Sequence, residues 1–346
     1  MGVSDTTRGF ASDNASGVHP DVMAAIAGAN LGHVHAYGDD PWTREATGAI
    51  RAAFGEQAEV FFVFNGTGAN CTALQALMRP HEYVICPASA HINVDECGAP
   101  ARFTGGTLAP VPTPDGKLTP ALVEGAITGV GFEHHSQPRV VSITQATEYG
   151  TVYRPDELAA LAATARAHGL RVHLDGARLA NAAAALGVSL GEACAGADVV
   201  SFGGTKNGAM LAEAVVFLDP ALAEGFKYVR KQSAQLSSKM RFVAAQFTAL
   251  LADDLWRKNA SHANGMAAAL AEGVRDIPGV RITQAVDANE VFAVLPHDAI
   301  ERLQAEFDFY AWDERAGEVR WVASWDTTEE DVARFVAAIE RVMTAR

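Results

Sequence analysis

The sequence predicts an α/β fold, with a large domain built on a mostly parallel central sheet covered by helices and a smaller C-terminal α+β domain. Short runs of β-branched and aromatic residues alternate with longer alanine-rich helical stretches up to about residue 219. Strands such as residues 60–64 are apolar on both faces, which is typical of a parallel sheet with helices on both sides. Beyond residue 219 this alternation stops, which indicates a second, smaller domain.

The expected elements follow one another along the chain. Helical patterns occur at residues 41–54, 68–78, 155–168 and 176–186, and strand patterns at residues 59–64, 82–86, 139–144, 170–175, 198–202 and 213–217. A nearly all-helical stretch then continues to residue 274, followed by shorter strands at 280–283, 289–295 and 318–322 and a helix at 329–343. The predicted large domain comprises residues 15–250, and the predicted small domain comprises residues 1–14 and 251–346.

Composition and charge exclude several classes of protein. The 346 residues are 49% hydrophobic and 20% charged, as in a compact enzyme rather than a disordered chain. A formal net charge of -14 argues against nucleic acid and anionic membranes as partners. The sequence has neither a membrane-spanning apolar run nor the apolar region of a signal peptide, so a cytoplasmic location is expected. The four cysteines lack CxxC spacing, so neither a zinc knuckle nor a disulfide framework is expected.

The first segment that carries chemistry is Phe64-Asn65-Gly66-Thr67-Gly68-Ala69-Asn70, between a predicted strand and a predicted helix. Glycines let the backbone approach an anion there, and the free N–H groups of the helix point toward it. Cys71 stands where a dinucleotide fingerprint needs its third glycine, and no Gly-Lys-Ser/Thr follows as in a Walker A motif. The segment therefore indicates another kind of phosphate cradle, or only a tight turn.

The second segment, Arg171-Val172-His173-Leu174-Asp175-Gly176-Ala177-Arg178, is a strand that ends in an acidic residue. A carboxylate at the carboxyl end of a buried parallel strand lies where open α/β sheets bind ligands. Asp175 is expected to face a cation or a donor, such as a protonated pyridine nitrogen. Arg178 offers a forked donor for a carboxylate in the same pocket. A structural Asp–Arg pair is the alternative.

The third segment, Asp198-Val199-Val200-Ser201-Phe202-Gly203-Gly204-Thr205-Lys206-Asn207-Gly208, places one lysine among small residues after a strand. A nucleophilic lysine must be desolvated or lie near other positive charge, and flanking glycines leave space for a bulky ring at its tip. A surface lysine in a loop is the alternative.

Taken together, these segments resemble the pyridoxal-phosphate L-threonine aldolases, within the β-eliminating lyase group. The resemblance covers the chain from Ser12 nearly to the C-terminus and implies the fold-type-I architecture of pyridoxal-phosphate enzymes. It rests on Ser12-Asp13, Tyr37-Gly38-Asp39-Asp40-Pro41, Asn65-Gly66-Thr67-Gly68-Ala69-Asn70, His91 with Glu96, His173-Leu174-Asp175-Gly176-Ala177-Arg178, Thr205-Lys206-Asn207-Gly208 and Val319-Arg320-Trp321-Val322.

The resemblance implies pyridoxal 5'-phosphate as the cofactor. Lys206 would bind it as a Schiff base, His91 would stack on the pyridine ring, and Asp175 would pair with the ring nitrogen. The remaining cofactor contacts that it implies are Gly66 and Thr67 at the phosphate, Arg178 and Thr205.

The resemblance also implies a small amino-acid substrate and a homo-oligomer. Ser12, Arg178 and Arg320 would bind the substrate α-carboxylate. Tyr37 and the region around Arg241 would reach the site from a neighbouring subunit, because such sites form at a dimer interface. The assembly is commonly a tetramer of two such dimers.

The proton acceptor of the reaction is less well defined by the sequence. His91 is one candidate, directly or through a water. His135, or its neighbour His134, would approach the β-hydroxyl group of the substrate according to the same resemblance. A solvated pair of loop histidines is the alternative.

The sequence also departs from the family pattern near the expected position of the β-substituent. Gln145-Ala146-Thr147-Glu148-Tyr149 stands where many relatives have Glu-Asn-Thr-His-Asn. Asp95 stands where some relatives have Tyr, and Asn14 follows Ser12-Asp13 where Thr is usual. These differences concern the preferred side chain of the substrate rather than the cofactor.

The reaction implied is cleavage of a β-hydroxy-α-amino acid, of the L-threonine or L-allo-threonine type, into glycine and an aldehyde. Cleavage of phenylserine, β-elimination, transamination or racemisation on the same fold are alternatives, and so is a non-catalytic binding protein. A different class of enzyme, a metal-dependent hydrolase, would use His33 and His35 with Asp39 and Asp40 as ligands. We expect no metal in the site.

Overall fold

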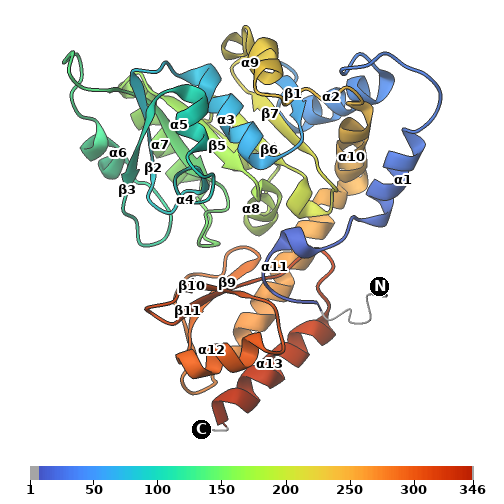
Figure 1. The fold of residues 1–346 in the computed structure, drawn as a ribbon, viewed down its shortest axis with the longest axis vertical. Helices are drawn as coiled ribbons and strands as arrows, with labels where there is room; N and C mark the ends of the chain where they lie inside the picture. Colours follow the sequence, from blue (N-terminus) through green and yellow to red (C-terminus); the bar gives the residue numbers. More distant parts are fainter. Residues whose placement is uncertain (1–7, 345–346) are drawn as a thin grey trace.

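A seven-stranded sheet forms the centre of the larger part of the computed structural model, which describes residues 8–344 (Figure 1). The strand order is β1-β7-β6-β5-β4-β2-β3. Five adjacent strands, β6 to β3 in this order, are parallel, whereas β7 is antiparallel to both of its neighbours. The strands are β1 (Glu59–Val63), β2 (Glu82–Pro87), β3 (Thr107–Val111), β4 (Gln137–Thr144), β5 (Arg171–Gly176), β6 (Val199–Gly203) and β7 (Glu213–Phe217). The predicted mostly parallel sheet is confirmed.

Helices cover both faces of this sheet. Successive strand residues point to opposite faces. Val200 therefore belongs to the core that includes residues of α2, α7, α8 and α10, whereas its neighbour Val199 belongs to the core that includes residues of α3 and α9. The helices of the larger part are α1 (Pro20–Gly28), α2 (Pro41–Phe54), α3 (Gly66–Leu77), α4 (His91–Val94), α5 (Ala99–Thr104), α6 (Pro120–Ala126), α7 (Pro155–Ala167), α8 (Leu179–Leu186), α9 (Phe226–Gln232) and α10 (Arg241–Leu251). Because one sheet separates two apolar layers, its strand ends are the natural place for a polar site.

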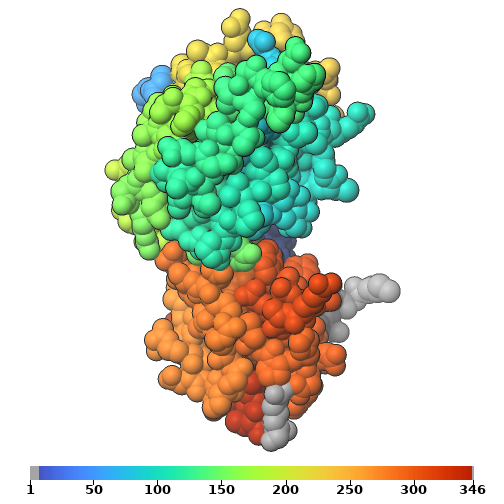
Figure 2. Space-filling view, turned by 90° about the vertical axis from the view of Figure 1, so that its left-hand side faces the viewer, coloured from blue at the N-terminus to red at the C-terminus, as the bar shows by residue number. Residues whose placement is uncertain are grey.

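A smaller antiparallel sheet lies beyond the first part, with the strand order β10-β11-β9-β8. Figure 2 shows the two parts one above the other. Trp321 and Phe335 form the centre of the second core, and Phe10 from the N-terminal segment stacks on Phe335 at 4.6 Å between ring centroids. The elements are α11 (Leu255–Val274), β8 (Arg281–Ile282), β9 (Glu290–Val294), α12 (His297–Gln304), β10 (Tyr310–Asp313), β11 (Glu318–Val322) and α13 (Glu329–Thr344).

Helix α11 joins the two parts. Trp256 near its start packs in the core of the first sheet, and Leu270 near its end packs in the core of the second. The predicted boundary at residues 250 and 251 stays a prediction, and residues 1–7 of the predicted segment 1–14 lie outside the described residues. No helix within residues 8–344 is long and apolar enough to cross a membrane.

Candidate active site

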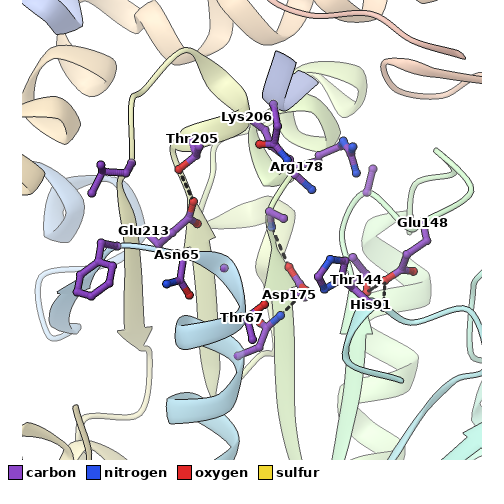
Figure 3. A pocket seen from close by; sticks show the side chains of 17 residues that line it. Asn65, Thr67, His91, Thr144, Glu148, Asp175, Arg178, Thr205, Lys206 and Glu213 are labelled. Atoms are coloured by element: carbon purple, nitrogen blue, oxygen red, sulfur yellow. Dashed lines mark hydrogen bonds between the residues drawn. The ribbon is translucent and has the colours of Figure 1, made fainter. Parts of the chain in front are cut away.

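A cavity of about 580 Å³ opens beside the carboxyl ends of β4 and β5 (Figure 3). The sequence predicted this edge of the sheet because Asp175 lies at the end of its strand. The cavity is lined by Asn14, Phe64, Asn65, Gly66, Thr67, Asn70, His91, Thr144, Ala146, Glu148, Asp175, Ala177, Arg178, Thr205, Lys206, Leu211 and Glu213. The structure therefore brings all the residues predicted to contact the cofactor into one cavity.

The amino end of helix α3 lines this cavity with Gly66 and Thr67. Asn65 caps the helix, and its Oδ1 accepts a hydrogen bond from the backbone N–H of Gly68 at 2.6 Å. The first N–H groups of a helix have no carbonyl partner within it, and the helix dipole makes this end attractive to an anion. Gly66 has open space where a Cβ would lie, so the turn leaves room for a ligand.

Asp175 is held at the base of the cavity by two hydrogen bonds. Oδ1 accepts from the backbone N–H of Ala177 at 3.0 Å, and Oδ2 accepts from Nδ2 of Asn70 at 2.7 Å. Asn70 Nδ2 also donates to Oε1 of Glu96 at 2.9 Å, and the same oxygen lies 2.9 Å from Nδ1 of His91. A continuous chain of polar contacts therefore fixes both Asp175 and the His91 ring.

The pKa values of His91 and Glu96 reflect this arrangement. The hydrogen bond with Glu96 raises the pKa of His91, and burial raises the pKa of Glu96. Both shifts favour a proton held between Nδ1 of His91 and the Glu96 carboxylate.

Lys206 follows β6 in a short 3-10 helix, Thr205–Asn207, and its side chain lines the cavity. Burial and the nearby positive charge of Arg178 lower the pKa of its amine. A lowered pKa increases the fraction of neutral amine, which is the form that attacks a carbonyl carbon. The neighbouring Thr205 donates its hydroxyl proton to Oε1 of Glu213 at 2.6 Å, and burial raises the pKa of Glu213 to about 7.

Arg178 is fixed by a buried carboxylate from the N-terminal segment. Its Nε and Nη2 donate to Oδ2 and Oδ1 of Asp13 at 2.7 and 3.1 Å. Burial, the largest single effect, would raise the pKa of Asp13. The charges of Arg178 and Lys206 and the hydrogen bonds from Arg178 and Asn289 together outweigh burial, so the pKa lies below its usual range. Glu290 Oε1 lies 3.5 Å from Nη2 of Arg178 and 3.6 Å from Nη1 of Arg320, so one carboxylate connects the two arginines.

Glu148 is a buried carboxylate in this cavity, at a position where the sequence departs from the family pattern. Its Oε1 accepts from the backbone N–H of His91 at 2.8 Å and from the hydroxyl of Thr144 at 2.7 Å. Burial raises the pKa of Glu148 to about 7. Its position just beyond a buried strand is a signal in the sequence that could have identified it.

Comparison with known proteins is consistent with this site. The β-eliminating lyase family model matches residues 9–297. The low specificity L-threonine aldolase of Pseudomonas aeruginosa is 49% identical over 99% of this chain and 100% of its own length. The chain belongs to the L-threonine aldolase group of the β-eliminating lyase family. The low specificity L-threonine aldolase of Pseudomonas sp. (strain NCIMB 10558) is 46% identical over the same shares of both chains.

Solved structures agree with this membership of the L-threonine aldolase group. The threonine aldolase of Leishmania major has 33% identity and a TM-score of 0.92, over 97% of this chain and 99% of that one. Aspartate aminotransferase from Thermus thermophilus, at 19% identity and a TM-score of 0.70 over 94% of this chain and 89% of that one, shares the fold alone. The fold-type-I architecture predicted from the sequence is confirmed.

Two residues predicted to bind substrate lie just outside the cavity lining. Ser12 accepts a hydrogen bond from the N–H of Asn14 at 3.1 Å, so it caps the turn from which Asn14 reaches the cavity. Arg320 is half-buried and is connected to Arg178 through Glu290. Their predicted contacts with substrate stay predictions.

The structure places two other predicted residues away from the cavity. Tyr37 is 53% exposed and has a positive φ of 61°, and its ring centroid lies 5.3 Å from Nζ of Lys231. His135 is exposed and lies just before the amino end of β4, whereas the cavity lies at the carboxyl end. It lines a separate hollow with His134 and Tyr83. The strand lies between His135 and the cavity, so within this chain His135 does not reach the predicted substrate site.

The alternative metal site gains no support from the structure. Across the part of the chain that the structure describes, no group of three or more His, Cys, Asp and Glu side chains is arranged to hold a metal ion. Asp40 instead caps α2, accepting from the N–H and the hydroxyl of Thr43 at 2.8 and 2.7 Å. His33 and His35 are exposed.

Proposed function

We propose that the chain is a pyridoxal-phosphate-dependent L-threonine aldolase that cleaves β-hydroxy-α-amino acids of the L-threonine or L-allo-threonine type into glycine and an aldehyde. The observation that carries the proposal is that one cavity holds Lys206, Asp175, Arg178 and the amino end of α3. Full-length similarity to low specificity L-threonine aldolases supports the same reaction.

The residues of the cavity fit pyridoxal phosphate in their chemistry. The amino end of α3, with Gly66 and Thr67, suits the phosphate, and the Asp175 carboxylate suits a protonated ring nitrogen. Lys206 offers an amine of lowered pKa for the aldehyde carbon. The Gly66 turn has open space for the group. When bound, pyridoxal phosphate supplies an electron sink for the bonds at the amino-acid α-carbon.

The cavity also fits the α-carboxylate of an amino acid. Within residues 8–344, Asp13 engages Nε and Nη2 of Arg178, which leaves Nη1 for a carboxylate ligand. Arg320 adds a second positive charge behind Glu290. A substrate held at this end has its α-carbon fixed, and proper orientation of the bond to be broken is a large part of catalysis.

The test is an assay on purified protein with pyridoxal phosphate, using L-threonine, L-allo-threonine and L-phenylserine, with Lys206→Ala measured in parallel. We expect an absorbance band near about 420 nm that depends on Lys206, followed by release of an aldehyde. The relative rates identify the preferred side chain. A band without aldehyde would contradict aldol cleavage and favour elimination or transamination, and the absence of a band would contradict the cofactor assignment.

The assembly is proposed to be a homotetramer in which Tyr37 reaches the site of a neighbouring subunit. Exposure of this large aromatic side chain supports the proposal. Light scattering of the purified protein tests it, and a monomer would contradict it. The cytoplasmic location stays a prediction from the sequence.

A further inference from the structure

Among the residues that the structure describes, one side-chain oxygen of Glu148 finds no hydrogen-bond donor. The residue is 7% exposed, and both hydrogen bonds that its side chain accepts go to Oε1. Oε2 is buried and has no partner within residues 8–344. A buried acceptor without a donor costs about 1–3 kcal/mol, so its retention in a cavity points to a donor that arrives with a ligand.

The two contacts of Oε1 fix Glu148 in this position. One donor is the backbone N–H of His91 at the start of α4, and the other is the hydroxyl of Thr144 at the end of β4. Figure 3 shows Glu148 beside His91 and Thr144, on the other side of Asp175 from Glu213. Glu148 is therefore anchored through one oxygen in the wall of the same cavity that contains Arg178 and Lys206.

We propose that Glu148 accepts the β-hydroxyl proton of the amino-acid substrate. This inference depends on the proposed aldolase reaction and names the base that it requires. The proton moves from the β-oxygen to Oε2 of Glu148, and the electron pair of that O–H bond forms the C=O bond of the aldehyde. The Cα–Cβ bond breaks, and its electron pair stays with the glycine fragment until a proton adds at Cα. Loss of the proton from Glu148 then restores the carboxylate.

The ionisation of Glu148 suits this role. Burial raises its pKa to about 7, and a general base works best when its pKa lies near the working pH. Glu213 is the other cavity carboxyl whose pKa burial raises to about 7, but its Oε1 accepts from Thr205, beside Lys206. The titratable or charged groups that face Glu148 are His91, Asp175, Arg178, Cys86 and Tyr153.

The test compares Glu148→Gln with the unsubstituted enzyme in two reactions. The amide keeps an oxygen for the donors from His91 and Thr144 but cannot accept a proton. Cleavage of L-threonine should fall by about 10²- to 10⁴-fold in kcat. Exchange of the glycine α-proton with deuterium, followed by NMR in D2O, needs no β-hydroxyl group and should be retained. Cleavage by the unsubstituted enzyme tests the proposed function. The ratio of the cleavage rates of the unsubstituted enzyme and Glu148→Gln tests the role of Glu148.

Two outcomes in these reactions would overturn the proposal. One is cleavage by Glu148→Gln within about tenfold of the unsubstituted rate. The other is an equal loss of cleavage and glycine exchange, because a structural role would reduce both.

A third readout needs no catalysis. In the cofactor-free chain labelled with ¹³C at the glutamate carboxyls, the signal lost in Glu148→Gln should titrate near about 7, and a second such signal should be lost in the matched Glu213→Gln variant. Titration of the Glu148 signal near the ordinary glutamate pKa of 4.5 would overturn the buried setting on which the proposal rests.

Discussion

The ion pair between Asp13 and Arg178 should contribute far more to stability than an equally short pair on the surface. Both side chains are buried, with exposed fractions of 1% and 8%. Asp13→Asn keeps the shape but removes the charge, and removing one partner of a buried pair costs about 3–5 kcal/mol. Glu306 and Arg341 provide the matched control, because they also approach to 2.7 Å but are 50% and 57% exposed. Glu306→Gln should cost less than about 1 kcal/mol.

The assay is urea unfolding of the cofactor-free chain, followed by tryptophan fluorescence at one protein concentration. Asp13→Asn should lose about 2–5 kcal/mol more free energy of unfolding than Glu306→Gln. Because the folded-state pKa of Asp13 lies below its ordinary value of 3.8, this contribution is present at neutral pH and is lost only in acid, as the pH falls through the lowered value. Equal losses in the two variants would show that burial does not decide the strength of the pair.

Three further predictions concern the packing and ionisation of the site. Gly203→Ala should lose about 1–3 kcal/mol in the same unfolding assay, because the added Cβ would lie 2.9 Å from backbone atoms of Ala177; unchanged stability would contradict the close approach. Burial raises the folded-state pKa of Glu213 from 4.5 to about 7. The contribution of Glu213 to the free energy of unfolding is therefore fully present below its unfolded-state pKa of 4.5 and is lost as the pH rises through about 7. Glu213→Gln should therefore reduce that loss between pH 5 and 8 by up to about 3 kcal/mol, and an identical pH profile would contradict it. Asp175→Asn should bind pyridoxal phosphate about 10- to 100-fold more weakly in equilibrium dialysis, because a hydrogen bond to a charged group is lost; unchanged affinity would contradict the pairing of Asp175 with the ring nitrogen.

The sequence predicted the strands of the sheet interior but missed two strands at sheet edges. Strand β3, Thr107–Val111, contains Pro110, which weakens a strand pattern but is tolerated at an edge where its missing N–H needs no partner. Strand β10, Tyr310–Asp313, is only four residues long and its register shifts between Ala311 and Asp313. Edge strands receive their pairing from a neighbour, so their own sequence need not show a clear alternation.

Local motifs predicted the parts of the site that one strand and its following turn can build. Lys206 and Asp175 each lie at such a turn, so their positions could be predicted from sequence alone. Asp13 contacts Arg178 across 165 residues of sequence, and no local pattern encodes that contact. Local sequence patterns also could not show which of Glu148 and His135 lies in the cavity. Their positions at opposite ends of β4 depend on the direction of the strand relative to the cavity.

Lys206 is proposed to bind pyridoxal phosphate covalently through its side-chain amine. The most direct test loads the purified chain with pyridoxal phosphate, reduces it with borohydride, and locates the label by peptide mass spectrometry. We expect one reduced pyridoxyl group, on the peptide that contains Lys206. A label on an exposed residue such as Lys231 with none on Lys206, or no label at all, would contradict it.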